Sequence, residues 1–222
     1  MKVVHIVIGI LLLTLGVAFA EEPAAPVVDQ QFSPEQEQRI DDLKSLSVPG
    51  VFEALHSPEF SVTQDYMDKA IYQALGSRSV EAIADAMVYV RSPLAQVSAE
   101  GSRNLYLAKR VCQVFPDQAI DALLDIYSSA SARIRANVIY VVGQMAGGPA
   151  VKNLLVEALY DTTVCQPVTD ETLGDPLRVC DTAYNQLVLR YKIEDVLRVI
   201  GTGHSIDVRD YHIQHLLALD AL

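Results

Sequence analysis

The sequence is poor in positive charge. It has 17 lysines and arginines against 28 aspartates and glutamates, and its formal charge is −11 at pH 7. Nucleic acids and anionic membrane surfaces are bound through clusters of basic side chains, and no run of lysine or arginine occurs here. The sequence therefore excludes nucleic acid from the expected partners and disfavours an anionic membrane surface.

Several common catalytic motifs are missing as well. The chain contains no glycine-rich phosphate loop, no G-x-S-x-G sequence and no H-E-x-x-H sequence. We therefore predict that the protein has no catalytic activity of its own, no catalytic residues and no cofactor.

Cysteine is also scarce, with Cys112, Cys165 and Cys180 present. In an oxidising compartment, Cys165 and Cys180 could close a loop of about 15 residues with a disulfide, for about 3 kcal/mol in the chain-entropy model. Against this, Cys180 belongs to an apolar helix face that suits a buried thiol equally well. Cys112 is predicted to be a core residue rather than a nucleophile, because no histidine or asparagine lies close to it in sequence.

Hydrophobic residues make up 50% of the chain and charged residues 20%, which is a globular composition.

Residues 1–20 have a basic start, a long apolar core and the small-x-small ending Ala18-Phe19-Ala20, the layout of a secretory signal peptide cleaved after Ala20. An uncleaved anchor is the alternative, but the stretch is short for a span of about 20 residues. We expect a periplasmic or secreted protein without stable membrane insertion after cleavage.

Residues 21–34 contain three prolines and no apolar period, which predicts a flexible linker. Residues 35–222 are predicted to form the folded domain. Its apolar spacing is that of helices, and no β-strand is expected between Ser61 and Leu222. Residues 162–176 are predicted to be a loop, and residues 193–200 a short helix.

The clearest helical pattern runs from Ser131 to Asp161. Apolar residues follow the spacing of one helix face before Gly147 and Gly148, and again after Pro149, so two short helices can form a hairpin. Similar pairs are predicted in residues 61–90 and 93–127. The apolar positions 134, 138, 141, 142 and 145 of the first helix correspond to 180, 184, 187, 188 and 191, and to 208, 212, 215, 216 and 219.

Two-helix units of about 40 to 47 residues are typical of HEAT and armadillo solenoids. The segments IRANVIYVVGQM and PAVKNLLVEALYD resemble a HEAT repeat, with basic Arg135 entering the first helix and acidic Asp161 ending the second. PLRVCDTAYNQLVL is similar to the start of another repeat, and DVRDYHIQHLLAL is a weaker match. The resemblance covers residues 128–222. It implies an all-α fold, an α-α superhelix of four to five helical hairpins, and a binding or scaffolding role without particular chemistry.

The predicted second helices carry acidic residues on their polar sides. Like charges four residues apart destabilise a helix by a few tenths of a kcal/mol, so helix stability does not explain them. In HEAT solenoids the second helices usually line the concave groove, so the resemblance implies an acidic groove for a basic protein, a basic peptide or cations. A solvated face that keeps the protein soluble is the alternative. The candidate residues are Glu81, Asp85, Asp121, Asp125 and Glu157.

His212 and His215 lie three residues apart on the last predicted helix, close enough for both to bind one metal ion. No third ligand stands at a diagnostic spacing, so partly buried packing histidines are the preferred interpretation, and no metal site is predicted.

The last predicted helix, residues 207–222, has leucines on more than one side, whereas repeat arrays need a polar cap. We therefore predict that a partner or a second copy covers part of it, as in a homodimer. These leucines are Leu216, Leu217, Leu219 and Leu222.

These features together predict an exported helical-repeat adaptor or scaffold that binds another protein. One alternative is an enzyme subunit, because some HEAT-like proteins are lyases that act on bound pigments; this would require a deep pocket with convergent polar groups. Another is an envelope protein that binds cations through the DETLGD segment, residues 170–175, although this segment lacks the ligand spacing of a calcium loop.

Overall fold

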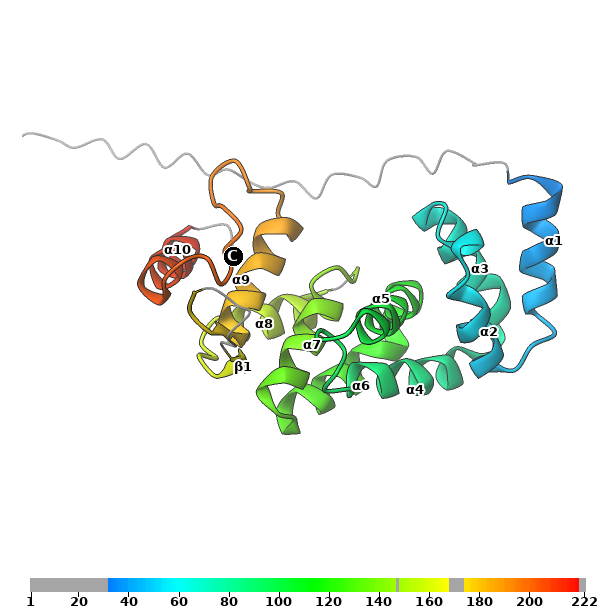
Figure 1. The fold of residues 1–222 in the computed structure, drawn as a ribbon, viewed down its shortest axis with the longest axis horizontal. Helices are drawn as coiled ribbons and strands as arrows, with labels where there is room; N and C mark the ends of the chain where they lie inside the picture. Colours follow the sequence, from blue (N-terminus) through cyan, green and yellow to red (C-terminus); the bar gives the residue numbers. More distant parts are fainter. Residues whose placement is uncertain (1–31, 147, 168–173, 220–222) are drawn as a thin grey trace, which may run out of the picture. The chain divides into compact units, whose positions relative to one another are not determined.

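Helices account for most of the computed structural model, which describes residues 32–146, 148–167 and 174–219 (Figure 1). This confirms the all-α prediction at the level of fold class. In chain order the helices are α1 (Pro34–Leu43), α2 (Val48–Leu55), the 3-10 turn η1 (Pro58–Phe60), α3 (Gln64–Leu75), the 3-10 turn η2 (Gly76–Arg78), α4 (Ser79–Val90), α5 (Ala99–Val114), α6 (Pro116–Ser129), α7 (Ala132–Val142), α8 (Pro149–Ala158), α9 (Val179–Arg190) and α10 (Ile206–Ala218).

Several helices begin where the sequence offers a cap. The side chains of Ser33 and Thr63 accept backbone hydrogen bonds from the first turns of α1 and α3. Pro116 and Pro149 occupy the first turns of α6 and α8, where a missing N–H costs nothing. The start of α8 at Pro149 is as predicted.

Helices pack against neighbours two places away in the chain. Along the odd-numbered series, α1 contacts α3, α3 contacts α5, α5 contacts α7, and α7 contacts α9. Along the even-numbered series, α2 contacts α4, α4 contacts α6, and α6 contacts α8. Among successive helices, α4 packs against α5, α5 against α6, and α7 against α8. The last helix, α10, packs against α9.

The core follows the predicted apolar spacing in the central hairpin. Val138, Val141, Val142 and Met145 are buried, whereas Ile134 is half-buried. Burying a large aliphatic side chain contributes roughly 1.5–3 kcal/mol, so these positions hold α7 among its neighbours.

A short antiparallel ribbon interrupts the helical pattern. Strand β1 (Val164–Gln166) pairs with β2 (Leu177–Arg178), and β1 contacts α7. The expectation of no strand between Ser61 and Leu222 is therefore wrong. Strands this short leave no recognisable alternation in the sequence. Beside the ribbon, the backbone N–H of Val179 donates to the carbonyl of Thr163 at 3.1 Å, which adds to the pairing.

The last part of the chain also differs from its predicted pattern. In α10 the buried residues are Arg209, Ile213 and Leu216, whereas Val208 is 42% exposed. The helix is thus rotated relative to the predicted frame, because the ion pair of Arg209 with Asp181 allows a charged residue to face the core. Residues 193–200 form turns rather than the predicted short helix, although Ile193, Leu197 and Ile200 are buried there.

The predicted signal peptide, its cleavage site after Ala20 and most of the linker lie outside the described residues. The folded part begins before the expected boundary at residue 35, because α1 starts at Pro34 and the ring of Phe32 packs against Tyr66 with centroids 5.3 Å apart. In the part of the chain that the structure describes, no helix combines the length and the apolar character needed to cross a membrane.

Candidate functional site

The five predicted acidic residues lie on three helices that are neighbours in space. Glu81 and Asp85 belong to α4, Asp121 and Asp125 to α6, and Glu157 to α8. Helix α6 contacts both α4 and α8. Asp85 is half-buried, and the other four residues are exposed. We call this solvent-facing side of α4, α6 and α8 the even-helix face.

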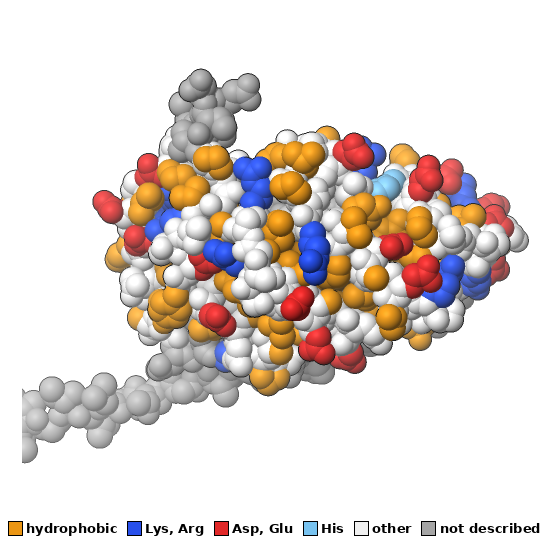
Figure 2. Space-filling model, turned by 90° about the horizontal axis from the view of Figure 1, so that it is seen from below, with side chains coloured by type: hydrophobic (Ala, Val, Ile, Leu, Met, Phe, Trp, Pro, Cys, Tyr) orange, Lys and Arg blue, Asp and Glu red, His pale blue; other side chains and the backbone are white. Residues whose placement is uncertain are grey.

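The even-helix face has little local charge compensation. Within the described residues, the ion pairs involve one of its five carboxylates: Arg91 Nη2 lies 4.0 Å from Asp125 Oδ2, and both side chains are exposed. Exposed pairs of this kind contribute roughly 0–1 kcal/mol. Figure 2 views the side on which α4 and α6 lie in Figure 1, and it shows acidic side chains dispersed among hydrophobic and basic ones. The face is therefore mixed, with apolar, acidic and basic side chains, rather than uniformly acidic.

A cleft of about 260 Å³ lies outside the even-helix face, between α5, α7 and the loop that joins α4 to α5. The loop is held by Asn137, which is fully buried. Its Nδ2 donates to the carbonyls of Val90 and Ser92 at 2.9 and 3.0 Å, and its Oδ1 accepts from Gln96 Nε2 at 2.8 Å. These bonds hold the loop that forms one wall of the cleft. Its lining residues are Ala95, Gln96, Ser102, Leu105 and Tyr140.

Lys109 lies beside this cleft, and its contacts with two tyrosine rings were not predicted from the sequence. Its Nζ is 4.8 Å from the ring centroid of Tyr140 and 5.5 Å from that of Tyr106. Cation–π contacts of this kind contribute about 0.5–2 kcal/mol. Burial, and secondarily the nearby charge of Arg110, lower the pKa of Lys109. The only sequence signal is the i, i+3 spacing of Tyr106 and Lys109, because Tyr140 comes from another helix.

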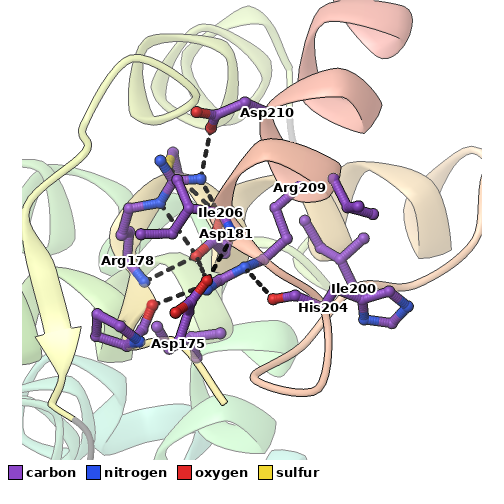
Figure 3. Close-up of polar contacts among 12 residues, drawn as sticks. Asp175, Arg178, Asp181, Ile200, His204, Ile206, Arg209 and Asp210 are labelled. Carbon is purple, nitrogen blue, oxygen red and sulfur yellow. Dashed lines mark hydrogen bonds and ion pairs between the residues drawn. The ribbon is translucent and has the colours of Figure 1, made fainter.

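The most deeply buried charges join α9 to α10. Asp181 and Arg209 are both 0% exposed. The carboxylate of Asp181 accepts hydrogen bonds from Arg178 Nη2 at 2.9 Å and from Arg209 Nη1. Arg178 Nη2 also donates to Asp210 Oδ1 at 2.6 Å. In Figure 3 the side chains of Arg178 and Arg209 both point toward Asp181, so the two buried cations share this carboxylate.

The charged groups of this cluster are held by hydrogen bonds to one another and to backbone carbonyls. Burial alone would lower the pKa of Arg178, but its hydrogen bonds to Asp181 and Asp210 raise the pKa overall. Arg209 Nε donates to the carbonyl of His204 at 3.1 Å, and Nη1 donates to that of Pro176 at 2.9 Å. Arginine stays protonated in proteins, so neither guanidinium can exchange a proton with a substrate. The cluster therefore connects α10 to α9.

The cysteines are buried free thiols in this structure. Cys165 Sγ is bonded to the carbonyl of Leu177 at 3.3 Å, and Cys180 Sγ lies 3.8 Å from Asp181 Oδ1. Burial raises the pKa of Cys165 to about 11 and the pKa of Cys180 to about 12. The thiols of Cys165 and Cys180 each contact an oxygen acceptor instead of each other. A disulfide between them under oxidising conditions stays a prediction. Cys112 is a core residue, with a pKa raised by burial to about 12.

The two histidines have different environments. His212 is half-buried, with ring centroids 6.2 Å from Tyr184 and 5.8 Å from Tyr211, and burial lowers its pKa. His215 is exposed, so its predicted packing position is wrong, for the reason that α10 is rotated. Across the described ranges, no group of three or more histidine, cysteine, aspartate or glutamate side chains could hold a metal ion.

The DETLGD segment lies largely outside the described residues, which resume at Gly174. Asp175, its last residue, accepts a hydrogen bond from the backbone N–H of Ile206 at 2.8 Å. This carboxylate therefore caps the start of α10.

Comparison of the chain with protein-family models, with curated proteins and with solved structures finds no match.

Proposed function

We propose that the protein is an exported HEAT-like adaptor that binds a basic protein through the even-helix face. The observation that carries this proposal is the adjacency of α4, α6 and α8, which collects five carboxylates on one side with a single weak ion pair among the described residues. Carboxylates without local partners attract a cationic surface and accelerate its association. Glu81 is favoured by the helix dipole in the first turn of α4, but helix stability gives no reason for the positions of the other four.

Two further features support the HEAT-like assignment. The two series of helices, odd against odd and even against even, have the contacts that stacked helical pairs make with their neighbours in a solenoid. Arg135 and Asp161, the motif residues of the central hairpin, form a bidentate ion pair, with Nε–Oδ2 at 2.7 Å and Nη2–Oδ1 at 3.2 Å. This pair connects the start of α7 to the segment after α8. The α-α superhelix is therefore part of the proposal.

The proposal is tested with a short oligolysine peptide as a probe of cation binding. In the test variant, Asp121, Asp125 and Glu157 are replaced by lysine. In the matched control, Asp42, Glu194 and Asp195 are replaced by lysine, which changes the net charge equally at exposed positions away from the face. Binding is measured by fluorescence anisotropy.

We expect the test variant to bind at least about tenfold more weakly than the natural protein, a loss of about 1.4 kcal/mol, and the control to lose much less. Equal losses in the two variants would mean that net charge alone attracts the peptide, and would overturn the proposed face.

A further inference from the structure

We infer that the segment bound by the even-helix face is an amphipathic helix, with an apolar edge and basic flanks, that lies along α4. This inference rests on the proposed function and names the kind of partner. It starts from Val80, Ala84 and Val88, which follow one another at i, i+4 and i+8 on α4. Val80 is 76% exposed, Val88 is 65% exposed, and Ala84 is also exposed. Residues four apart lie above one another on a helix, so the three form one apolar line.

Acidic residues border this line on both sides. Glu81 and Asp85 each follow a residue of the line by one position, which turns them by about 100° about the helix axis toward one side. On the other side lies α6, because Arg91, three residues beyond Val88, reaches Asp125 of α6. Glu81 and Asp85 therefore lie on one side of the apolar line, and α6, which carries Asp125, lies on the other.

Helix α4 has a separate apolar face that the core already covers, formed by Ala82, Ile83, Ala86, Met87 and Val90. The exposed line is thus a second apolar surface on the same helix. Valine is a poor helix former compared with the polar residues that usually occupy exposed positions, so local stability does not explain it. On α1, by contrast, Gln38, Asp41 and Asp42 make the exposed side polar. A helix that is apolar on two sides is typically covered on both.

The chemistry of the occupant follows from this arrangement. A partner helix that presents apolar residues at i, i+4 and i+7 can cover the line of Val80, Ala84 and Val88. Lysine or arginine residues on either side of that edge would then meet Glu81 and Asp85 on α4 and Asp125 on α6. The partner is therefore a basic amphipathic helix.

Two synthetic peptides of identical lysine and leucine composition test this inference. In one peptide the leucines lie on one helix face, and in the other the order is scrambled. Their affinities are measured by fluorescence anisotropy, and helix formation on binding by circular dichroism. We expect the amphipathic peptide to bind about tenfold more tightly than the scrambled one and to gain helicity.

The variant Val80→Ser/Val88→Ser should remove this preference and leave the affinity for oligolysine unchanged. The matched control is Val62→Ser/Val196→Ser, at valines that are each 64% exposed and lie outside α4; it should retain the preference. Equal binding of the two peptides to the natural protein, or a preference that survives Val80→Ser/Val88→Ser, would overturn the helical partner but not the proposed function. Failure of the natural protein to bind any cationic peptide would overturn both.

Discussion

At the residue scale, the carboxylate of Asp181 lies between two guanidinium groups that are themselves buried, those of Arg178 and Arg209. Asp181→Asn would leave Arg209 without a carboxylate partner and Arg178 with Asp210 alone, and breaking a buried pair in this way costs about 3–5 kcal/mol. We therefore predict a loss of about 3 kcal/mol in the free energy of unfolding, measured by urea denaturation.

The control is Asp210→Asn. Asp210 also forms an ion pair with Arg178, but the side chain of Asp210 is 53% exposed. We therefore expect Asp210→Asn to lower the free energy of unfolding by about 1 kcal/mol or less. Similar losses in the two variants would contradict a central role for Asp181.

A second prediction at this scale concerns Gly143, the C-cap of α7. A Cβ atom at this position would lie 2.3 Å from Gln186 Oε1 and 2.5 Å from Gln186 Cβ, so either the side chain or α9 must move. Overpacking of this kind costs about 1–3 kcal/mol, and Gly143→Ala should lower the melting temperature measured by circular dichroism.

Gly76 provides the matched control. It has helical backbone angles, and an added Cβ would meet no atom within 4 Å. Gly76→Ala should stabilise the protein by about 0.4–1 kcal/mol, because it restricts the unfolded chain. A melting temperature for Gly143→Ala as high as that for Gly76→Ala would show that α7 and α9 do not approach so closely.

The acid sensitivity of the fold gives a third prediction. Burial would raise the pKa of Asp161, but hydrogen bonds from Arg135 and Thr163 lower it overall, below its ordinary value of 3.8. Since the folded-state pKa lies below the unfolded one, the stabilisation is complete above about pH 3.8 and is lost as the pH falls through the folded-state value. Asp161→Asn should therefore reduce stability at neutral pH and flatten its decline in acid.

Asp68 tests the sign of this effect. It pairs with Arg110, yet burial raises its pKa overall, so its folded state favours the proton. Asp68→Asn should consequently not flatten the acid limb of a plot of unfolding free energy against pH. If it flattened that limb as much as Asp161→Asn does, the assignment of acid sensitivity to Asp161 would be wrong.

At the element scale, helices were predictable where local signals agree. The hairpin from Ser131 to Asp161 has an apolar period and a proline start, and its core positions are largely as expected, although α7 ends at Val142, before the stop predicted at Gly147 and Gly148. The ribbon of β1 and β2 and the rotation of α10 were not predictable. They depend on pairing across the chain, such as that of Asp181 with Arg209, and no local period encodes such contacts.

In the candidate site, too, some features follow from local spacing and others depend on tertiary contacts. Helical spacing was sufficient to place Glu81 and Asp85 on the solvent side of α4. The cleft beside Lys109 requires α5, α7 and the intervening loop to converge, and only the tertiary structure shows this.

The attachment of α10 provides a prediction at this scale. Its buried contacts are few, namely Arg209, Ile213 and Leu216. Arg209→Ala should therefore loosen this helix selectively. We expect amide hydrogen exchange in residues 206–218 to become at least about tenfold faster, which corresponds to about 1.4 kcal/mol, while exchange in α3 to α7 stays unchanged. The exposed Arg198→Ala is the control. Uniformly faster exchange across the molecule would contradict a separable last helix.

At the scale of the whole molecule, the formal charge of −11 could attract cations without any particular surface. We instead assign the attraction to carboxylates that the neighbouring helices α4, α6 and α8 hold together. Salt screens exposed charges over about 8 Å at physiological ionic strength, so a local contact and a diffuse attraction respond differently to the removal of local charges.

The most direct measurement is the dissociation constant of the oligolysine peptide over a series of salt concentrations. The natural protein and the control with lysine at Asp42, Glu194 and Asp195 should both lose affinity steeply as salt rises. The variant with lysine at Asp121, Asp125 and Glu157 should bind weakly at low salt and show a much shallower dependence. Identical salt dependence in the two variants would contradict the claim that the even-helix face is where this protein meets its partner.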